Sequence, residues 1–255
     1  MSDLRVYAFA PGWGLPSTGP FALKLLAWLS HAGIAHSRVT ENRAGRGPLG
    51  KSPWIEFEGR RMGDSDAIIR HLAARHGLAD PTAVTDAASA RADALKTAFE
   101  ERFHQVLEWE LFVTPQGRAG IGQIVAEQAP RVLAPLITAQ MARHFRRQLH
   151  ARGIGRLPAA EVAAIGFRQL DGLAHWLEDT GGLIGGDAPV LADFAVWGQV
   201  APMLAWPMAT PVGDHAKRLA PLLAWHTRMR AGLAPAETAA GATIGRGLAG
   251  LAPAG

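Results

Sequence analysis

Residues 50–76, GKSPWIEFEGRRMGDSDAIIRHLAARH, carry the most informative pattern of the chain. Apolar and polar side chains alternate over 53–58, which predicts a β-strand, and the Gly-Arg pair at 59–60 supplies a tight turn. Residues 61–63 then return as a second short strand, and apolar residues recur at helical spacing over 64–76. The stretch therefore predicts an antiparallel hairpin whose second strand leads directly into a helix.

The residues before this hairpin add a strand, a helix and another strand. Residues 4–10 form a short apolar strand, 21–32 place their apolar residues on one helical face, and 35–41 contain a β-branched pair. A strand–helix–strand unit of this kind forms a parallel pair with a right-handed crossover. The predicted order is therefore β-α-β-β-β-α, an α/β domain with a mixed four-stranded sheet.

Only helical periodicity is found from about residue 86 onward, which predicts an all-α second half. The expected helices cover 86–111, 119–152 with breaks around Pro130 and Pro135, 158–180, 190–206 and 213–231. The expected organisation is a first domain over 1–78, a linker over 79–85, a helical domain over 86–232 and an Ala/Gly-rich tail over 233–255.

Composition excludes several classes of protein. The chain has 255 residues, 48% of them hydrophobic and 19% charged, and it contains no cysteine. Disulfide scaffolds, cysteine-ligated metal sites and cysteine nucleophiles are therefore excluded. We expect no transmembrane helix, because no stretch of about 18 apolar residues is uninterrupted. The start does not read as a secretory signal, so we expect a cytoplasmic protein. The net charge of +4 is scattered, and no nucleic-acid partner is expected.

A glycine-rich loop over 12–19 lies between the first strand and the first helix, where such loops often hold phosphate. A P-loop requires Lys-Ser/Thr after its last glycine, but Pro20-Phe21 follow Gly19. The dinucleotide fingerprint fails as well, because the glycine spacing is wrong and only one βαβ unit is present. Nucleotide binding is therefore a minor alternative.

Two short motifs flank the hairpin. A cis bond at Ser52-Pro53 would keep Ser52 out of the sheet and leave its backbone free to bind an extended peptide, whereas a trans proline would only start a strand. Asp64 or Ser65 can cap the helix that begins there. The same hydroxyl and backbone N–H groups also suit a ligand carboxylate, so plain capping and ligand binding both remain open.

Taken in this order, the motifs resemble the cytosolic glutathione transferase family. Residues 50–56 look like its cis-proline segment, 64–65 like its acidic-Ser pair, and 185–193 like the start of one of its buried helices. Residues 20–34 and 98–109 are similar to the failed-axon-connections/metaxin-like branch. The resemblance implies a thioredoxin-like N-terminal domain, an all-helical C-terminal domain and a homodimer.

The resemblance also implies a function: glutathione is a co-substrate, no metal is needed, and its thiolate attacks a hydrophobic electrophile. The expected glutathione-binding residues are Trp13, Lys51, Ser52, Pro53, Asp64 and Ser65. The expected substrate pocket involves Phe103, His104 and Leu107, or the residues around Phe112. Asp193 has an expected structural role at a buried helix start, where Val190 replaces the usual Ser/Thr cap and the capping box is lost.

The catalytic hydroxyl is the main departure from the family pattern. Gly19 stands where a Ser or Cys is common, and Tyr7, the single tyrosine, lies inside the first strand and is interpreted as a core or sheet-surface residue. Ser17 and Thr18 are the hydroxyls near the first helix, and Ser17 is preferred. A non-catalytic binding or interaction protein of the same fold is the alternative function.

One charged face remains. Arg143, Arg147 and His150 share a helix face at i, i+4 and i+7. They form either a solvated basic face or a cleft or interface that binds acidic groups.

Overall fold

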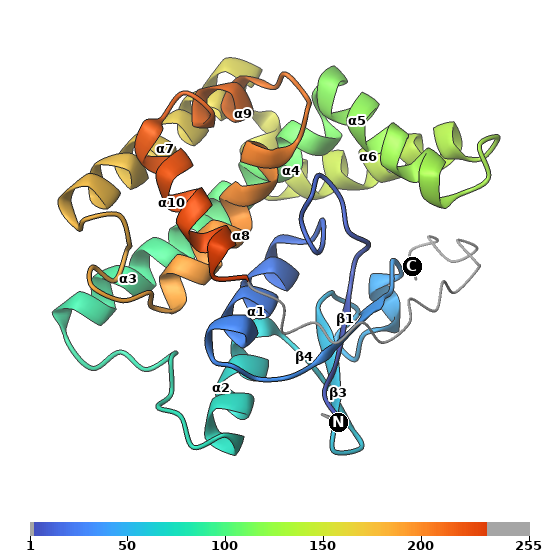
Figure 1. Ribbon diagram of the computed structural model, residues 1–255. Coiled ribbons are helices and arrows are strands. Elements are labelled where there is room, and N and C mark those ends of the chain that lie inside the picture. Colours follow the sequence, from blue (N-terminus) through green and yellow to red (C-terminus); the bar gives the residue numbers. More distant parts are fainter. Residues whose placement is uncertain (1–2, 234–255) are drawn as a thin grey trace.

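The structure is a computed structural model, and it describes residues 3–233. A sheet with two helices forms the N-terminal half, and a cluster of helices forms the rest (Figure 1). The expected tail lies outside the described residues beyond Leu233. No helix among the described residues is long and apolar enough to cross a bilayer.

The N-terminal half confirms the predicted β-α-β-β-β-α order. Its elements are β1 (Arg5–Ala8), α1 (Pro20–His31), β2 (Ser37–Thr40), a 3-10 turn (Ala44–Arg46), β3 (Trp54–Phe57), β4 (Arg60–Gly63) and α2 (Ser65–Arg75). The sheet order is β2-β1-β3-β4, with β1 parallel to β2 and antiparallel to β3, and with β3 antiparallel to β4. The hairpin turn lies at Glu58 and Gly59, whose φ angles of 49° and 74° match the twist of the two strands.

The second half is all-helical, as predicted, with several boundaries shifted. Its elements are α3 (Ala87–Thr97), a π-helical segment η2 (Ala98–Phe103), α4 (His104–Phe112), α5 (Pro115–Gln128), α6 (Ala134–Ala151), a 3-10 turn (Ile154–Arg156), α7 (Ala159–Asp179), α8 (Leu191–Ala205), α9 (Pro211–Ala216) and α10 (Ala220–Ala231). The single helix expected over 213–231 is wrong. Pro221 lies in the first turn of α10 and has no N–H to continue a helix from α9, so the chain breaks there.

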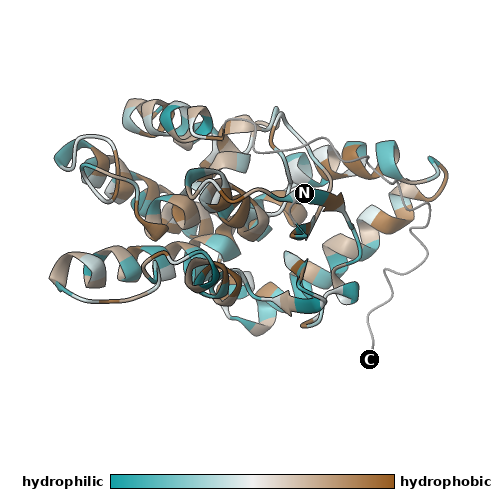
Figure 2. Ribbon diagram, turned by 60° about the horizontal axis from the view of Figure 1, so that its bottom comes forward, coloured by the Kyte–Doolittle hydropathy of each residue, from teal (hydrophilic) through white to brown (hydrophobic). Residues whose placement is uncertain are grey.

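Helix α8 is the centre of the molecule and packs along α1, so it joins the two halves (Figure 1). Every residue from Leu191 to Met203 is buried. Gly198 makes the close approach possible, because a Cβ atom there would overlap the carbonyl oxygen of Pro20. Hydrophobic residues gather along the inner helices (Figure 2), and the three tryptophans predicted as core, Trp197, Trp206 and Trp225, are buried among them.

Two buried lysines and two half-buried carboxylates join the two halves beside this contact. Lys24 of α1 forms ion pairs with Asp66 of α2 and with Glu100 of η2, the latter at 2.6 Å. Lys96 of α3 lies 2.7 Å from Asp66 and 3.0 Å from Glu100. Burial alone would raise the pKa of Asp66, but the two ammonium groups outweigh it and hold that pKa below its usual range. We call these four residues the charge tetrad.

A half-buried histidine, His226 of α10, makes the fold sensitive to acid. The Trp197 Nε1–H donates to His226 Nδ1 at 3.1 Å, which requires that nitrogen to be unprotonated. Burial, with a contribution from Arg230, lowers the pKa of His226 to about 4 from the ordinary 6.5. Since the unfolded chain then binds the proton first, we expect the free energy of unfolding to fall as the pH drops from 6.5 towards 4.

Urea unfolding at several pH values checks this, with His226→Gln as the comparison. The glutamine keeps an acceptor for Trp197 but does not titrate, so its unfolding free energy should depend less on pH in that window. Identical pH dependence in the two proteins would contradict a role for His226.

Candidate functional site

The Ser52-Pro53 peptide bond is cis and immediately precedes β3. Sheet pairing begins at Trp54, so Ser52 stands outside the ladder, as the cis alternative required. The Ser52 hydroxyl oxygen is buried and has no hydrogen-bond partner among the described residues. An unpaired buried hydroxyl is costly, and a hydrogen bond from a polar ligand group at this position would remove that cost.

The Asp64-Ser65 motif starts α2. Asp64 has a backbone φ angle of 68°, which residues other than glycine rarely adopt. Its Oδ1 accepts a hydrogen bond from the Ala67 N–H at 2.9 Å. Asp64 therefore caps the helix. Ser65 is 6% exposed, and within residues 3–233 its hydroxyl makes no hydrogen bond. The capping alternative thus accounts for Asp64 but leaves the Ser65 hydroxyl unused.

Sheet register brings the two motifs together. Trp54 pairs with Gly63 across the hairpin, so the residue pairs just outside the ladder, Ser52-Pro53 and Asp64-Ser65, lie at the same end of β3 and β4. The N-terminus of α2 opens at that end, where its unpaired backbone N–H groups favour an anion. Lys51 is exposed next to Ser52. The arrangement suits an extended ligand that ends in a carboxylate.

The loop before α1 is held by the helical half. Gly12 and Leu15 close a tight turn, in which Trp13 and Gly14 have φ angles of 54° and 70°. Trp13 packs edge-on against Trp206 at 5.9 Å, and Arg230 Nη2 donates to the Gly14 carbonyl at 3.1 Å. Trp13 is thus half-buried between the two halves.

The two candidate catalytic hydroxyls differ in access. Ser17 is completely buried, and its Oγ accepts a hydrogen bond from the Gly19 N–H at 3.1 Å, so it shapes the loop and presents no surface to a ligand. Thr18 is half-buried and donates to the Ala10 carbonyl at 3.3 Å. The burial of Ser17 therefore argues against the prediction that Ser17 is the catalytic hydroxyl. A side chain at Gly19 would meet the Phe9 ring at 3.0 Å, so the loop leaves little room for the hydroxyl common at that place.

Tyr7 lies on the sheet, as interpreted from the sequence. Its ring stacks on Trp54 at 3.6 Å, and its hydroxyl donates to Glu56 Oε2 at 2.7 Å. Burial and the neighbouring carboxylate of Glu56 raise the pKa of Tyr7. The hydroxyl is already committed within the sheet.

The expected substrate pocket needs correction. Phe103 and Leu107 are completely buried and contribute to the core, because the two residues are one helical turn apart and both face inward. His104 is half-buried and packs near Phe21 at the start of α1, with 5.1 Å between ring centroids. Phe112 is half-buried and stacks on Phe145 of α6 at 3.8 Å.

The sequence analysis missed the groups that hold His104. Its Nδ1 lies 2.9 Å from Gln199 Oε1 of α8, and its Nε2 lies 3.4 Å from Glu108 Oε1. Arg152 Nη1 in turn lies 3.0 Å from Glu108 Oε2. Only the spacing of His104 and Glu108, four residues apart on one helix, could have indicated part of this network.

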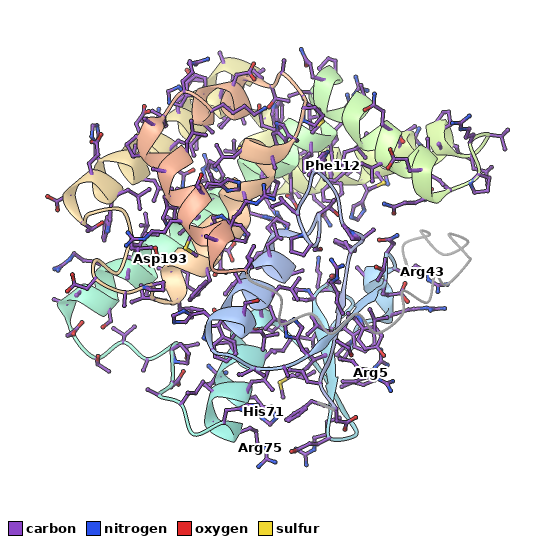
Figure 3. All side chains as sticks on the ribbon, in the orientation of Figure 1. Arg5, Arg43, His71, Arg75, Phe112 and Asp193 are labelled. Carbon is purple, nitrogen blue, oxygen red and sulfur yellow. The ribbon has the colours of Figure 1, made fainter. Side chains whose placement is uncertain are left out.

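Asp193 occupies the buried start of α8 (Figure 3). Its carboxylate accepts hydrogen bonds from the backbone N–H groups of Ile184, Gly185 and Val190 at 2.8, 3.1 and 3.0 Å, and from Trp225 Nε1 at 3.2 Å. The prediction of a lost capping box is half wrong: Val190 offers no side-chain acceptor, but Asp193 still bonds the Val190 N–H. Burial raises the pKa of Asp193.

No group of three or more side chains suited to a metal ion occurs in the part of the chain that the structure describes.

A mixed four-stranded α/β domain with a cis-proline beside a helix start, followed by an all-α domain, defines the glutathione-transferase-like fold. Residues 20–117 match the family model described as "Glutathione S-transferase N-terminal domain". A curated relative, isoprene-epoxide–glutathione S-transferase of Rhodococcus sp. (strain AD45), is 26% identical over 205 residues, which cover 71% of this chain and 79% of the relative. Residues 20–117 therefore match a glutathione S-transferase N-terminal domain, and the chain as a whole has a glutathione-transferase-like fold.

Two further comparisons place it more coarsely. Failed axon connections of Drosophila melanogaster is 32% identical over 73 residues, only 29% of this chain and 18% of that protein. The crystal structure of the β-etherase LigF from Sphingobium sp. strain SYK-6 superposes with a TM-score of 0.58 at 19% identity, over 91% of this chain and 96% of that one. The superposition supports the fold, with a thioredoxin-like first domain.

Proposed function

We propose that this protein is a glutathione transferase that adds the glutathione thiolate to a hydrophobic electrophile. The observation that carries the proposal is the pair of hydroxyls, Ser52 and Ser65, at one end of the β3–β4 hairpin, neither with a hydrogen-bond partner within residues 3–233. Glutathione is an extended peptide with a carboxylate at each end, and such a ligand would use both hydroxyls and the N-terminus of α2.

In the proposed binding mode, residues 1–78 hold glutathione and residues 86–232 hold the electrophile. The cysteinyl part of the peptide lies along Ser52-Pro53, and the γ-glutamyl carboxylate lies at Asp64-Ser65. Lys51 and Trp13 flank the ligand. The half-buried His104 and Phe112 offer the side chains of α4 for contact with the electrophile.

The chemistry requires a thiolate. An unperturbed thiol has a pKa of about 8.5, and each unit by which it is lowered corresponds to about 1.4 kcal/mol. The backbone N–H groups in the first turn of α1 and the Thr18 hydroxyl would supply this stabilisation, since Ser17 is buried. The sulfur then forms a bond to an electrophilic carbon as the bond to the leaving group breaks. For an epoxide, a substrate class suggested by the name of the Rhodococcus relative, the ring C–O bond breaks and the oxygen takes up a proton.

The alternative is a binding protein of the same fold without turnover. Gly19 and the buried Ser17 favour it, because the loop then lacks a free side-chain hydroxyl at the usual place. The similarity to a named transferase over most of both chains favours catalysis instead.

Titration of bound glutathione distinguishes the two. We expect calorimetry to detect binding at millimolar glutathione or below, and the ultraviolet absorbance of the thiolate to show a pKa below that of free glutathione. No heat and no thermal shift at millimolar glutathione would contradict the proposal altogether. Binding with the thiol pKa of free glutathione would leave only the binding protein.

Ser65→Ala is expected to weaken glutathione binding about tenfold or more while the melting temperature changes little. A hydrogen bond to a charged ligand group is worth about 1.5–3 kcal/mol, and the free protein loses no bond to Ser65. Thr227→Ala, which removes a hydroxyl from the exposed face of α10, is the control. Equal affinities of the two variants would show that Ser65 does not contact the ligand.

We further propose that the protein is a homodimer, acts in the cytoplasm in detoxification and belongs to the failed-axon-connections/metaxin-like branch; the family resemblance supports these points. Sedimentation velocity over a hundredfold concentration range should show a dimer mass. A monomer mass throughout would contradict the homodimer.

A further inference from the structure

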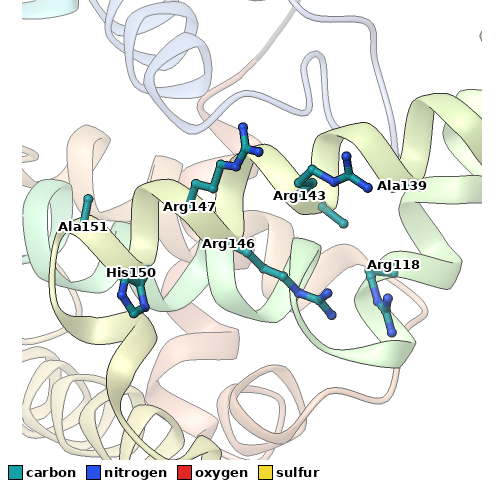
Figure 4. A pocket seen from close by; sticks show the side chains of 8 residues that line it. Arg118, Ala139, Arg143, Arg146, Arg147, His150 and Ala151 are labelled. Carbon is teal, nitrogen blue, oxygen red and sulfur yellow. The ribbon is translucent and has the colours of Figure 1, made fainter.

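An arginine-lined hollow lies between α5 and α6 and contains the basic face of Arg143, Arg147 and His150 (Figure 4). Its volume is about 580 Å³. Arg143, Arg146, Arg147 and His150 line it from α6, and Arg118 lines it from α5. The remaining lining residues are alanines, whose short side chains leave the space open.

Helical spacing explains how the charges converge. The four α6 residues stand at i, i+3, i+4 and i+7 and therefore share one face of the helix. Arg118 approaches from the neighbouring helix, so the hollow is charged from two sides (Figure 4).

None of the four arginine side chains has a partner among the described residues. Within residues 3–233, the guanidinium groups of Arg118, Arg143, Arg146 and Arg147 make no hydrogen bond and no ion pair, and the Arg118 Nε–H is buried as well as unpaired. Among the described residues, no acidic side chain lines the hollow. Arg152, just beyond the end of α6, is paired instead, with its Nη1 3.0 Å from Glu108 Oε2.

The free protein carries a cost for this arrangement. Like charges four residues apart on a helix repel each other and reduce its stability, and a buried N–H without a partner adds to that cost. An anion in the hollow would remove both penalties. A guanidinium group donates two parallel hydrogen bonds to one phosphate or carboxylate group. Several guanidinium groups around one space would therefore favour a ligand with more than one phosphate or carboxylate.

We propose that this hollow binds a small anion with at least two phosphate or carboxylate groups. A volume of about 580 Å³ is in the range typical of small-molecule sites. In the part of the chain that the structure describes, the lining contains no Phe, Tyr or Trp on which a nucleic-acid base could stack, and the charges meet at one space instead of following a groove. The site shares no residue with the proposed glutathione site and does not depend on it.

Calorimetry of the purified full chain with tripolyphosphate tests the proposal, with inorganic phosphate as a ligand of lower charge. We expect tripolyphosphate to bind more tightly than phosphate and its affinity to fall with added salt. Arg143→Ala and Arg147→Ala should each weaken binding about tenfold or more, because a charge-assisted hydrogen bond is worth about 1.5–3 kcal/mol. Arg146→Lys keeps the positive charge but loses the two parallel N–H donors, and it should weaken tripolyphosphate binding less than either alanine variant.

Arg168→Ala is the matched control, since Arg168 is an exposed helical arginine on α7 outside the hollow. The altered side chains are exposed, and an unchanged melting temperature verifies the fold. No binding of tripolyphosphate, or an equal loss in Arg168→Ala, would overturn the proposal.

Two more measurements exclude other ligands. Binding to phosphatidylglycerol vesicles without binding of free tripolyphosphate would overturn the proposal in favour of a lipid surface. Displacement of tripolyphosphate by glutathione, with Arg143→Ala weakening both, would overturn it by assigning the hollow to the glutathione site. Failure of glutathione to bind anywhere would contradict only the proposed transferase function.

Discussion

Replacing Asp193 with alanine is expected to lower the free energy of unfolding by about 3–5 kcal/mol, a large share of the stability of most domains. The carboxylate accepts four hydrogen bonds, three from the backbone before α8 and one from Trp225 Nε1. The residue has no exposed surface, so water would not easily replace it. Each buried donor left unpaired costs about 1–3 kcal/mol.

A control variant separates the loss of these four hydrogen bonds from the general effect of removing a negative charge. Asp187→Ala removes an exposed carboxylate from the same loop and should change the unfolding free energy by less than about 0.5 kcal/mol. Asp193→Asn keeps one acceptor oxygen, and its loss of unfolding free energy should lie between those of Asp193→Ala and Asp187→Ala. Urea unfolding measures all three variants, and an Asp193→Ala midpoint equal to that of Asp187→Ala would show that the four hydrogen bonds are not needed.

Lys24→Met should be the second strongly destabilised variant. Lys24 is 1% exposed and pairs with Asp66 and Glu100, so a methionine of similar length leaves two carboxylates with Lys96 alone. Removing one partner of a buried ion pair typically costs about 3–5 kcal/mol, because the remaining charge stays buried. Lys51→Met, at an exposed lysine, should change the unfolding free energy little.

Acid should reduce the difference between Lys24→Met and the wild type. The pKa of Asp66 is lowered in the wild-type fold, so its contribution to stability is present above the unfolded pKa and is lost as the pH falls through the folded pKa. The variant has lost one of the two cations that lower this pKa, and it should lose less stability on acidification. A constant difference from pH 7 to pH 3 would contradict this explanation.

Much of the fold was predictable because its signals are local. The alternation over 53–58, the turn after Glu58 and the helical spacing over 64–76 each depend on near neighbours in the chain, and all three are present. The same locality explains the error at 213–231, where apolar spacing continues across a break that Pro221 makes. Periodicity shows which residues share a face but does not show where a helix is interrupted.

The candidate site was predictable only where register determines it. Pairing of Trp54 with Gly63 follows from the hairpin and brings the two flanking motifs together. The burial of Ser17 depends on how an irregular loop folds, and that of Phe103 depends on which helices cover η2, so neither could be read from the sequence. Lys24 and Lys96 were missed for a similar reason: their partners lie on other elements, and buried lysines are rare.

The close fit at Gly198 has a consequence for how such a chain can evolve. The first turn of α1, which faces the glutathione thiol in the proposed function, packs directly on α8 from the helical half. A methyl group at Gly198 would not fit between the two helices. Exchanging the helical half for that of another protein would therefore leave α1 without its matched partner α8 and Lys24 without Glu100. The two halves are consequently poor modules for recombination, and substitutions on α8 and on the first turn of α1 should be inherited as matched sets.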